Sequence, residues 1–365
     1  MKNLIAILAL LIGTLLYLLF FEDFAEQYCH RNPQPKVKLQ PIEEPKLRAE
    51  LLFTGDWMQH TPQINSAQHK SGFDYSESTK YIKPLMQRAD ITIVNFETTL
   101  TPNSNYSGYP MFRSPKELAD ALKSAGVDVA LLANNHCCDG GKRGIRTTIS
   151  ELLKRGILHT GTFSDSLDFH KNNTLRLKSG GIKFAFINYT YGTNGLPTPD
   201  SCIVNLIDTA RIKSHLKAIE RDSVDCIVAC MHWGNEYERR ASKGQKELAK
   251  LLHSYGVDIV VGSHPHVIQE IVADSLKVTA YSLGNFVSNQ QKRYTDGGVM
   301  LRIGVEKRKG SPCRFSTKAI PVWVRRSGYT IIPPEVGDTI SLDNNSMLRY
   351  NEFIKDCQER VGDYL

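Results

Sequence analysis

The sequence of 365 residues is poor in the residue types that are typical of non-globular chains. Glycine (26 residues) and proline (16 residues) are scarce, while 41% of the residues are apolar and 23% are charged. This balance excludes a disordered, a collagenous or a multi-span membrane protein. The formal net charge is +7, yet no Lys/Arg cluster is interleaved with aromatic residues, so we expect no nucleic-acid partner. The densest basic run, Glu306 to Gly310, is expected to be the solvated end of a hairpin.

The cysteines also fall short of a pattern, because the spacing of the eight present gives no disulfide framework. Cys226 and Cys230 lie in an apolar, strand-like run, and we expect them to be buried packing residues. Cys202 and Cys313 are the freer candidates for a bridge. The sequence leaves open whether those two are paired.

One apolar run at the N-terminus departs from the average composition. Leu4 to Phe21 carries no charge and comes close to the ~20 residues that a helix needs to cross a bilayer. The run ends in Leu18-Leu19-Phe20-Phe21, which offers no small-residue cleavage site, so we expect residues 1–25 to remain as a transmembrane signal-anchor. Lys2 precedes the run and acidic residues follow it. The positive-inside rule then predicts a single-pass protein of the cell membrane with a cytoplasmic N-terminus and an extracytoplasmic remainder, in a bacterial periplasm or at the cell surface.

Beyond the anchor, we expect a proline-rich linker over residues 26–48, a globular domain over 49–330 and a C-terminal helical extension over 331–365. Within the domain, strand-like runs alternate with amphipathic stretches, which is typical of an α/β sheet with helical crossovers. Strands are predicted at Leu51–Thr54, Ile91–Asn95, Val127–Ala133, Phe184–Tyr189, Asp225–Met231, Asp258–Gly262 and Val278–Leu283. Helices are predicted around Ser78–Gln87, Pro115–Ala125, Lys142–Arg155, Thr209–Arg221 and Lys243–Tyr255. Residues 298–325 have strand character without helices and predict antiparallel pairing.

Residue types that bind metals follow several of the predicted strands. The groups are Gly55-Asp56, Asn95-Phe96-Glu97, Asn134-Asn135-His136, His232-Trp233-Gly234-Asn235-Glu236 and His264-Pro265-His266. A single histidine at a strand end is more often structural, but the recurrence favours a site, because the carboxyl ends of strands converge at one edge of an open α/β sheet. Mixed oxygen and nitrogen donors without thiolates suit zinc, manganese or iron.

The ordered motifs resemble those of the CapA/PgsA capsule synthesis family, which is associated with poly-gamma-glutamate capsule formation and belongs to the calcineurin-like metallophosphoesterase superfamily. The matching segments are Gly55-Asp56-Trp57-Met58, Val94-Asn95-Phe96-Glu97, Asn134-Asn135-His136 with Asp139-Gly140, His232-Trp233-Gly234 with Glu236, Gly262-Ser263-His264-Pro265-His266-Val267 and Tyr281-Ser282-Leu283-Gly284-Asn285-Phe286. The resemblance covers about residues 50–300. It implies an α/β fold built as a four-layer α/β/β/α sandwich that holds one or two divalent ions (Mn, Zn or Fe).

The resemblance also implies roles for individual residues. The expected metal ligands are Asp56, Glu97, Asn135, His232, His264 and His266. His136 stands at the position of the superfamily's acid/base residue, and such a site can activate water while the histidine protonates a leaving group. The residues expected to contact substrate are Arg113, Trp233, Glu236 and Asn285, although a turn is an equal role for Asn285. The loop that carries Tyr106, Tyr109 and Phe112 is long enough to act as a lid or as a polymer-contact loop.

Some positions depart from the superfamily pattern. Met58 stands where a histidine ligand is usual, and Cys137-Cys138 follows the Asn-His pair, where we expect inert neighbours of a turn. Two hypotheses for function therefore remain. The protein is a metal-dependent hydrolase or transferase that acts on a phosphoester or an anionic polymer, or it is a non-catalytic partner of a membrane synthase or export complex.

Overall fold

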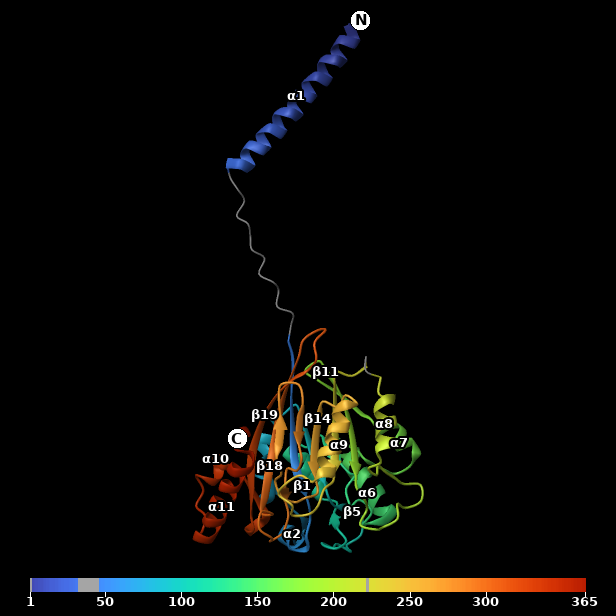
Figure 1. Cartoon of the computed structure of the whole chain (residues 1–365), viewed down its shortest axis with the longest axis vertical. Helices are drawn as coiled ribbons and strands as arrows, with labels where there is room; N and C mark the ends of the chain where they lie inside the picture. Colours follow the sequence, from blue (N-terminus) through green and yellow to red (C-terminus); the bar gives the residue numbers. More distant parts are fainter. Residues whose placement is uncertain (1, 32–45, 221–222) are drawn as a thin grey trace. The chain divides into compact units, whose positions relative to one another are not determined.

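The computed structural model describes residues 2–31, 46–220 and 223–365, and the chain forms two compact units, Met1–Glu44 and Pro45–Leu365. The first unit holds one helix, α1 (Lys2–Arg31) (Figure 1). Its segment Asn3–Tyr28 is long and apolar enough to cross a membrane, a property that signal sequences share. The side chains of this segment are exposed.

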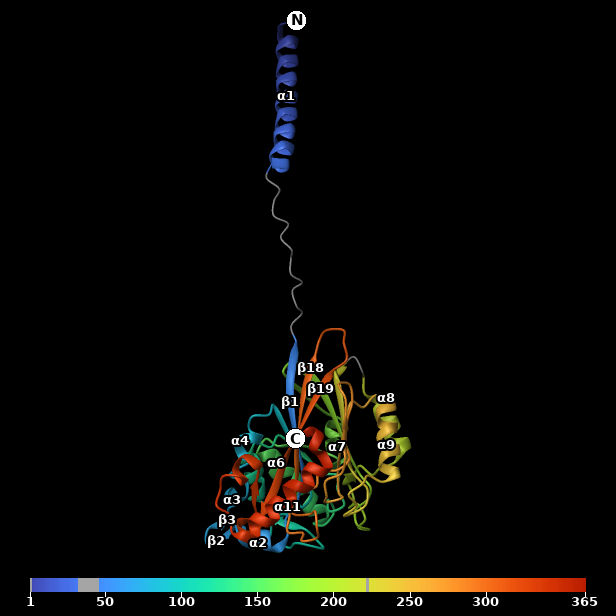
Figure 2. The ribbon, with the colours of Figure 1, turned by 60° about the vertical axis from the view of Figure 1, so that its left-hand side comes forward.

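Two large sheets form the centre of the second unit (Figure 2). The first has the order β20-β19-β18-β1-β4-β7-β8, with β17 paired to β1. Its strands are β1 (Leu47–Trp57), β4 (Ile91–Phe96), β7 (Val129–Leu131), β8 (Leu158–Thr160), β17 (Asn285–Val287), β18 (Gly297–Lys307), β19 (Arg314–Arg325) and β20 (Thr330–Ile332). The second has the order β10-β11-β13-β14-β16-β15. Its strands are β10 (Leu175–Ser179), β11 (Ile182–Thr190), β13 (Cys226–His232), β14 (Ile259–Ser263), β15 (Ile271–Ala273) and β16 (Val278–Ala280).

The remaining elements are short strands and the connecting helices. The strand pairs are β2 (Gln68–His69) with β3 (Gly72–Phe73), β5 (Thr99–Thr101) with β6 (Arg113–Pro115), and β9 (Thr162–Phe163) with β12 (Ile203–Val204). The helices are α2 (Thr61–Ala67), α3 (Ser76–Thr79), α4 (Lys83–Met86), α5 (Leu118–Ala125), α6 (Gly141–Lys154), α7 (Ser166–Asn172), α8 (Thr209–Ala218), α9 (Lys243–Ser254), α10 (Pro334–Gly337) and α11 (Asn344–Val361).

Three apolar clusters hold these layers together. The largest lies between the two sheets, where side chains such as Phe53 of β1 and Phe184 of β11 are fully shielded from water. A second cluster packs α5 and α6 on the outer face of the first sheet, and a third packs α8 and α9 on the outer face of the second. The central strands are thus buried on both faces, which explains their nearly continuous apolar sequences. The mixed α/β fold predicted from the sequence is confirmed.

The strands run so that their carboxyl ends gather at one end of the unit. β1, β4 and β7 are parallel neighbours in the first sheet, as are β11, β13 and β14 in the second. At the end of β1 a bulge separates Thr54 from Asp56, and the Asp56 N–H donates to Gly284 O at 2.9 Å. A Cβ on Gly55 would lie 2.0 Å from that same oxygen, so glycine is required there for β1 and the β17 segment to meet.

Several predicted elements differ in detail. Instead of one helix over Ser78–Gln87, the structure has α3 and α4, because Pro84 has no N–H to continue a helix. The last predicted residue of the helix over Thr209–Arg221 lies outside the described residues. The segment 331–365 adds α11 to the core between the sheets through Tyr350 and Phe353.

The antiparallel pairing predicted for residues 298–325 is confirmed by β18 and β19, whose connecting hairpin begins with the exposed Arg308 and Lys309. Cys226 and Cys230 are buried as predicted. Cys202 and Cys313 are both free thiols, so the bridge considered for them is not formed.

Candidate metal centre

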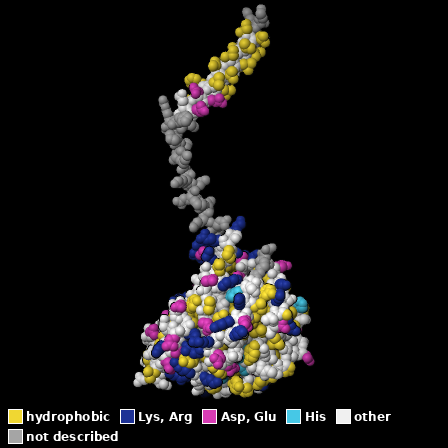
Figure 3. All heavy atoms as spheres, in the orientation of Figure 1, with side chains coloured by type: hydrophobic (Ala, Val, Ile, Leu, Met, Phe, Trp, Pro, Cys, Tyr) yellow, Lys and Arg dark blue, Asp and Glu magenta, His cyan; other side chains and the backbone are white. Residues whose placement is uncertain are grey.

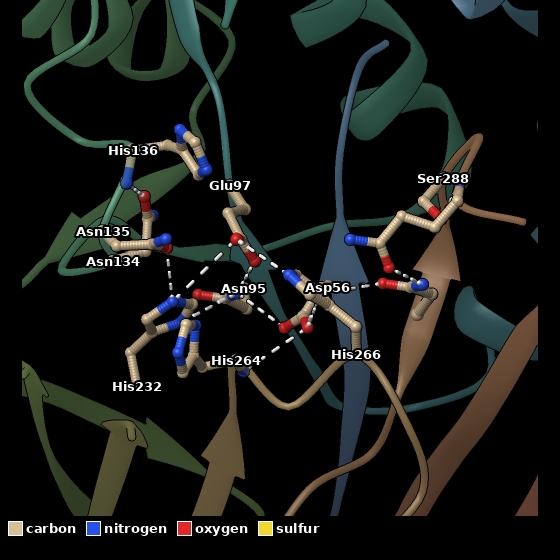
Figure 4. A network of polar contacts seen from close by, with 12 residues as sticks. Asp56, Asn95, Glu97, Asn134, Asn135, His136, His232, His264, His266 and Ser288 are labelled. Atoms are coloured by element: carbon tan, nitrogen blue, oxygen red, sulfur yellow. Dashed lines mark hydrogen bonds and ion pairs between the residues drawn. The ribbon is translucent and has the colours of Figure 1, made fainter. Parts of the chain in front are cut away.

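The carboxyl ends of the two sheets bring the predicted ligands into one cluster (Figure 4). From the first sheet come Asp56 at the end of β1, Glu97 after β4, and Asn135 and His136 after β7. From the second come His232, the last residue of β13, and two histidines after β14. All these side chains are at most 4% exposed: Asp56, Glu97, Asn135, His136, His232, His264 and His266. So many buried polar groups require partners, since burial of an unpaired one is costly.

The two acidic side chains are held by an amide that the sequence had not singled out as a site residue. Asn95 Nδ2 donates to Asp56 Oδ1 at 2.8 Å and to Glu97 Oε2 at 3.2 Å. The other oxygen, Glu97 Oε1, has no hydrogen-bond partner among the residues that the structure describes, and it lies 3.9 Å from His232 Nε2 and 3.8 Å from His266 Nε2. A buried carboxylate oxygen is therefore left facing two imidazole nitrogens.

Each imidazole is oriented by its own contacts. His266 Nδ1 lies 3.0 Å from Asp56 Oδ2 and 3.1 Å from Asn285 Oδ1, and His232 Nε2 lies 2.8 Å from Asn135 Oδ1. His264 Nδ1 is buried without a partner among the described residues.

The turn after β14 holds two of these histidines in an uncommon conformation. His264 and His266 have backbone φ values of +101° and +58°, in the region that residues other than glycine seldom adopt. Such strain is kept where surrounding structure imposes it, and it is concentrated at functional sites.

The donors present fit a divalent cation. Asp56, Glu97 and His266 each offer a ligand atom within 4.8 Å of the others, and so do Glu236, His264 and His266. The two groups share His266, and the second adds Glu236, an exposed residue expected from the sequence as a substrate contact. The unpartnered Glu97 Oε1 and His264 Nδ1 are atoms that an ion would satisfy. Carboxylates with imidazoles suit zinc, manganese or iron.

Burial shifts the titration of the same groups. Burial raises the pKa of Glu97, and the neighbouring Asp56 carboxylate raises it further. Burial, with the nearby His266, lowers the pKa of His264 to about 3, and burial likewise lowers the pKa of His232. Both imidazoles are thus neutral at physiological pH, the form that binds metals, and a cation would favour the ionised form of Glu97.

His136 lies beside this cluster as one half of a buried pair with Asp139. Its Nδ1 is 2.7 Å from Asp139 Oδ2, and that oxygen also accepts the Phe112 N–H at 2.6 Å. The Phe112 ring meets the imidazole edge-on with centroids 4.5 Å apart. The second ring nitrogen, Nε2, lies 3.4 Å from Asn194 Nδ2. Asp139 therefore orients the histidine and leaves Nε2 to face the site.

The structure assigns different roles to some predicted substrate contacts. Trp233 is 2% exposed in the cluster beneath α8 and α9, and its indole N–H donates to Tyr281 O at 3.0 Å, so the expectation that it lines a pocket is not supported. Asn285 orients His266 and donates to Thr295 O at 2.8 Å. Arg113 is half-buried in β6.

Neither Met58 nor His60 adds a nitrogen ligand to the cluster. Met58 is 2% exposed, and His60 lies outside both donor groups with its ring against Phe112 at 5.0 Å. In the loop after Glu97, predicted to be a lid or a polymer contact, Tyr109 is 76% exposed while Phe112 is fully buried.

Two further residues reach the site from the segment after β11. The Tyr191 ring lies 4.5 Å from the His264 ring, and Asn194 Oδ1 accepts from Asn135 Nδ2 at 3.1 Å. In the sequence, these two residues are marked only by their position after a strand, because neither lies in one of the groups of metal-binding residue types. Asp139, by contrast, stands in a motif already singled out, three residues after its partner.

Comparison with known proteins identifies the family. Residues 50–290 match the family described as bacterial capsule synthesis protein PGA_cap. The PGA biosynthesis protein CapA of Bacillus subtilis (strain 168) is 28% identical over 304 residues, which cover 80% of this chain and 75% of that protein. The capsule biosynthesis protein CapA of Bacillus anthracis is 28% identical over 314 residues, 76% of this chain and 74% of that protein. Among solved structures, the Haemophilus influenzae NAD nucleotidase is similar with a TM-score of 0.49 at 12% identity, over 85% of this chain and 56% of that one. The chain belongs to the CapA family of bacterial capsule synthesis proteins.

Proposed function

We propose that this protein is a divalent-metal-dependent hydrolase or transferase that acts in the synthesis or export of a capsule polymer of the poly-gamma-glutamate type. The observation that carries the proposal is the pair of donor groups that share the buried His266, with the His136–Asp139 pair beside them. A network needed only for stability would satisfy its own members, whereas Glu97 Oε1 and His264 Nδ1 have no partner among the described residues. The same arrangement supports a calcineurin-like metallophosphoesterase sandwich.

The residues divide the work between binding and proton transfer. One or two ions would be held by Asp56, Glu97, Asn135, His232, His264 and His266, with Glu236 as a further carboxylate. A bound cation supplies charge that polarises a phosphoryl or acyl oxygen and acidifies a bound water. Asn95 fixes both buried carboxylates in place. In its imidazolium form, with the Nδ1–H bonded to Asp139, His136 would donate the Nε2 proton to the leaving group and become neutral.

The substrate class proposed is an anionic polymer or a phosphoester. Tyr237 lies beside the site, with its ring 6.2 Å from that of His266, and Lys292 Nζ lies 3.6 Å from the Tyr237 ring centroid. This cation at the rim can attract an anionic group, as the half-buried Arg113 can.

A second candidate function is a non-catalytic partner of a membrane synthase or export complex. The observation that favours it is Met58, which occupies a buried position two residues after Asp56 without offering a nitrogen ligand. On this alternative, a metal would stabilise the domain but would turn over no substrate.

The metal hypothesis is tested by metal analysis of the purified protein and its variants. His266→Ala should lose the metal of both groups, while Glu236→Gln should lose at most the metal of the second. His136→Ala should keep its metal, while hydrolysis of a generic phosphodiester falls by roughly 10²–10⁴. His253→Ala, a half-buried histidine bonded to Thr279 and outside both groups, is the matched control and should keep metal and activity.

The outcomes separate the two functions. Equal metal content in the wild type, His266→Ala and a chelated sample would contradict the metal centre. Normal metal content and normal polymer production in His136→Ala would instead support the accessory role.

We also propose that α1 is a retained membrane anchor with its N-terminus in the cytoplasm and the second unit extracytoplasmic. Support comes from the apolar segment Asn3–Tyr28 and the absence of a small-residue cleavage site. Mass spectrometry of the membrane-extracted protein should find Met1 or Lys2 at the N-terminus. A mature start between residues 20 and 35 would reject the anchor.

A further inference from the structure

The end of the second unit opposite the metal centre is built from the beginnings of its parallel strands. We call this end the linker face and define it by residues 46–48, the β10–β11 turn (178–183), the β15–β16 turn (274–277) and the β18–β19 hairpin (307–314). Along β1 the linker face is separated from Asp56 by about 26 Å, at ~3.3 Å for each strand residue. A ligand on this face cannot touch the metal centre.

Contacts join these turns into one surface. Leu47 pairs with Lys307 between β1 and β18, and a Cβ on Gly180 would lie 1.6 Å from Arg48 O. The Phe315 N–H donates to Ser275 O at 3.0 Å, which ties the β18–β19 hairpin to the β15–β16 turn.

Several cations of the linker face form no ion pair within the described residues, although Asp274 and Glu306 lie on the same face. Lys178, Lys183, Arg308, Lys309 and Arg314 are exposed and form no ion pair with any residue in the described ranges, whereas Glu306 already serves Lys46 and Arg48. Lys178 and Lys183 stand directly opposite each other in the β10–β11 register. Like charges in directly opposite positions destabilise a hairpin. A bound anion would reduce the repulsion between these two lysines. Figure 3 shows Lys and Arg side chains gathered where the second unit begins.

Large apolar side chains protrude among these cations. Leu276 at the tip of the β15–β16 turn is 45% exposed, Val272 before it is 59% exposed, and Leu47 is 37% exposed. A soluble polyanion would use the cations alone. A lipid surface uses both, because apolar side chains enter the headgroup region while Lys and Arg meet the phosphates.

The length of the chain places a bilayer within reach. Residues 32–45 connect α1 to the first described residue of the second unit, Lys46, and a chain of that length spans at most about 50 Å. If α1 crosses the membrane, the chain that leads to it is attached to the second unit at Lys46, on the linker face. This step rests on the proposed anchor and is independent of the metal chemistry.

We propose that the linker face binds the anionic headgroups of phospholipids, with Leu276 entering the interfacial layer. The second unit then stands on the membrane with the metal centre at the end away from the lipid, where a polymer chain would have access.

The experiment uses residues 46–365, which contain all three apolar clusters and so retain the core of the unit without α1. This protein should sediment with vesicles of phosphatidylglycerol and phosphatidylcholine, less so at high salt, and not with phosphatidylcholine alone. The triple variant Arg308→Gln, Lys309→Gln and Arg314→Gln should lower the partition coefficient about 100-fold, at about five-fold for each basic residue.

The matched control removes the same charge from the other end of the unit. Lys116→Gln, Lys142→Gln and Arg143→Gln change exposed residues near the starts of α5 and α6 and should leave vesicle binding within about two-fold. Leu276→Ser should weaken vesicle binding about ten-fold.

Two outcomes would overturn the proposal. The first is equal loss of binding in the control variant, which would mean that only net charge matters. The second is binding of soluble poly-gamma-glutamate as tight as that of the vesicles, with no effect of Leu276→Ser, which would make the face a polyanion site. Metal content measured on the same samples separates these results from a failure of the metal centre, because the triple variant should keep its metal.

Discussion

Asn188 joins the two sheets just behind the metal centre, and its removal should weaken both the fold and the site. Its Oδ1 accepts the Ala133 N–H at 2.8 Å, and its Nδ2 donates to Cys230 O at 3.1 Å. Ala133 immediately precedes the Asn134–His136 segment, so this amide holds the segment against the second sheet. Asn188→Leu keeps the volume but removes the hydrogen bond that each of these two buried groups makes with the side chain.

The magnitude follows from those two contacts. A buried group that loses its partner costs about 1–3 kcal/mol, and the carbonyl suffers less than the N–H because it has a second lone pair. We therefore expect a loss of about 2–4 kcal/mol in the free energy of unfolding, equivalent to roughly 3–6 °C in Tm for a unit of this size. Metal affinity should fall as well, because Asn135 and His136 lose their support.

The assay is urea unfolding followed by tryptophan fluorescence, with metal-free and metal-loaded protein compared. Ile187→Leu is the control, since it alters the neighbouring fully buried side chain without removing a hydrogen bond and should cost under about 1.5 kcal/mol. An Asn188→Leu protein with the wild-type unfolding midpoint would refute the claim that the hydrogen bonds of this amide stabilise the contact between the two sheets.

Three other predictions concern single groups. Gly55→Ala places a methyl group 2.0 Å from a carbonyl oxygen and should abolish metal binding in equilibrium dialysis, whereas Gly244→Ala, with open space around it in α9, should raise Tm by about 1–2 °C. Burial lowers the pKa of His215 to about 4 from an ordinary 6.5. Between these pH values the unfolded chain binds a proton that the folded chain does not bind, so the free energy of unfolding should fall as the pH drops from 6.5 to 4. His215→Gln should make the free energy of unfolding, measured by urea titration, less dependent on pH over that range. Replacing both Cys137 and Cys138 by Ala should leave metal content and any hydrolytic rate within a few fold, and lost activity in a folded double variant would contradict the inert role.

Local patterns were sufficient to predict the α/β alternation and the convergence of the site. The apolar runs of β4, β13 and β14 mark strands buried on both faces, and the polar residues that follow them mark the carboxyl edge. The prediction failed where one residue changes the local chemistry, as Pro84 does in the first turn of α4. The prediction also missed some residues that hydrogen-bond to the ligands. The sequence around Asn95 and Asn194 does not indicate that their side chains contact Asp56 and Asn135.

The sequence by itself determined which residues stand at strand ends, since strand periodicity and turn residues are local properties. Only the tertiary structure decided what each of them does there. Trp233 and Glu236 follow the same strand three residues apart, yet one is buried in the apolar cluster and the other joins a donor group with His264 and His266. That outcome depends on how the two sheets pack and on the left-handed turn after β14, which are set by contacts between residues far apart in the chain.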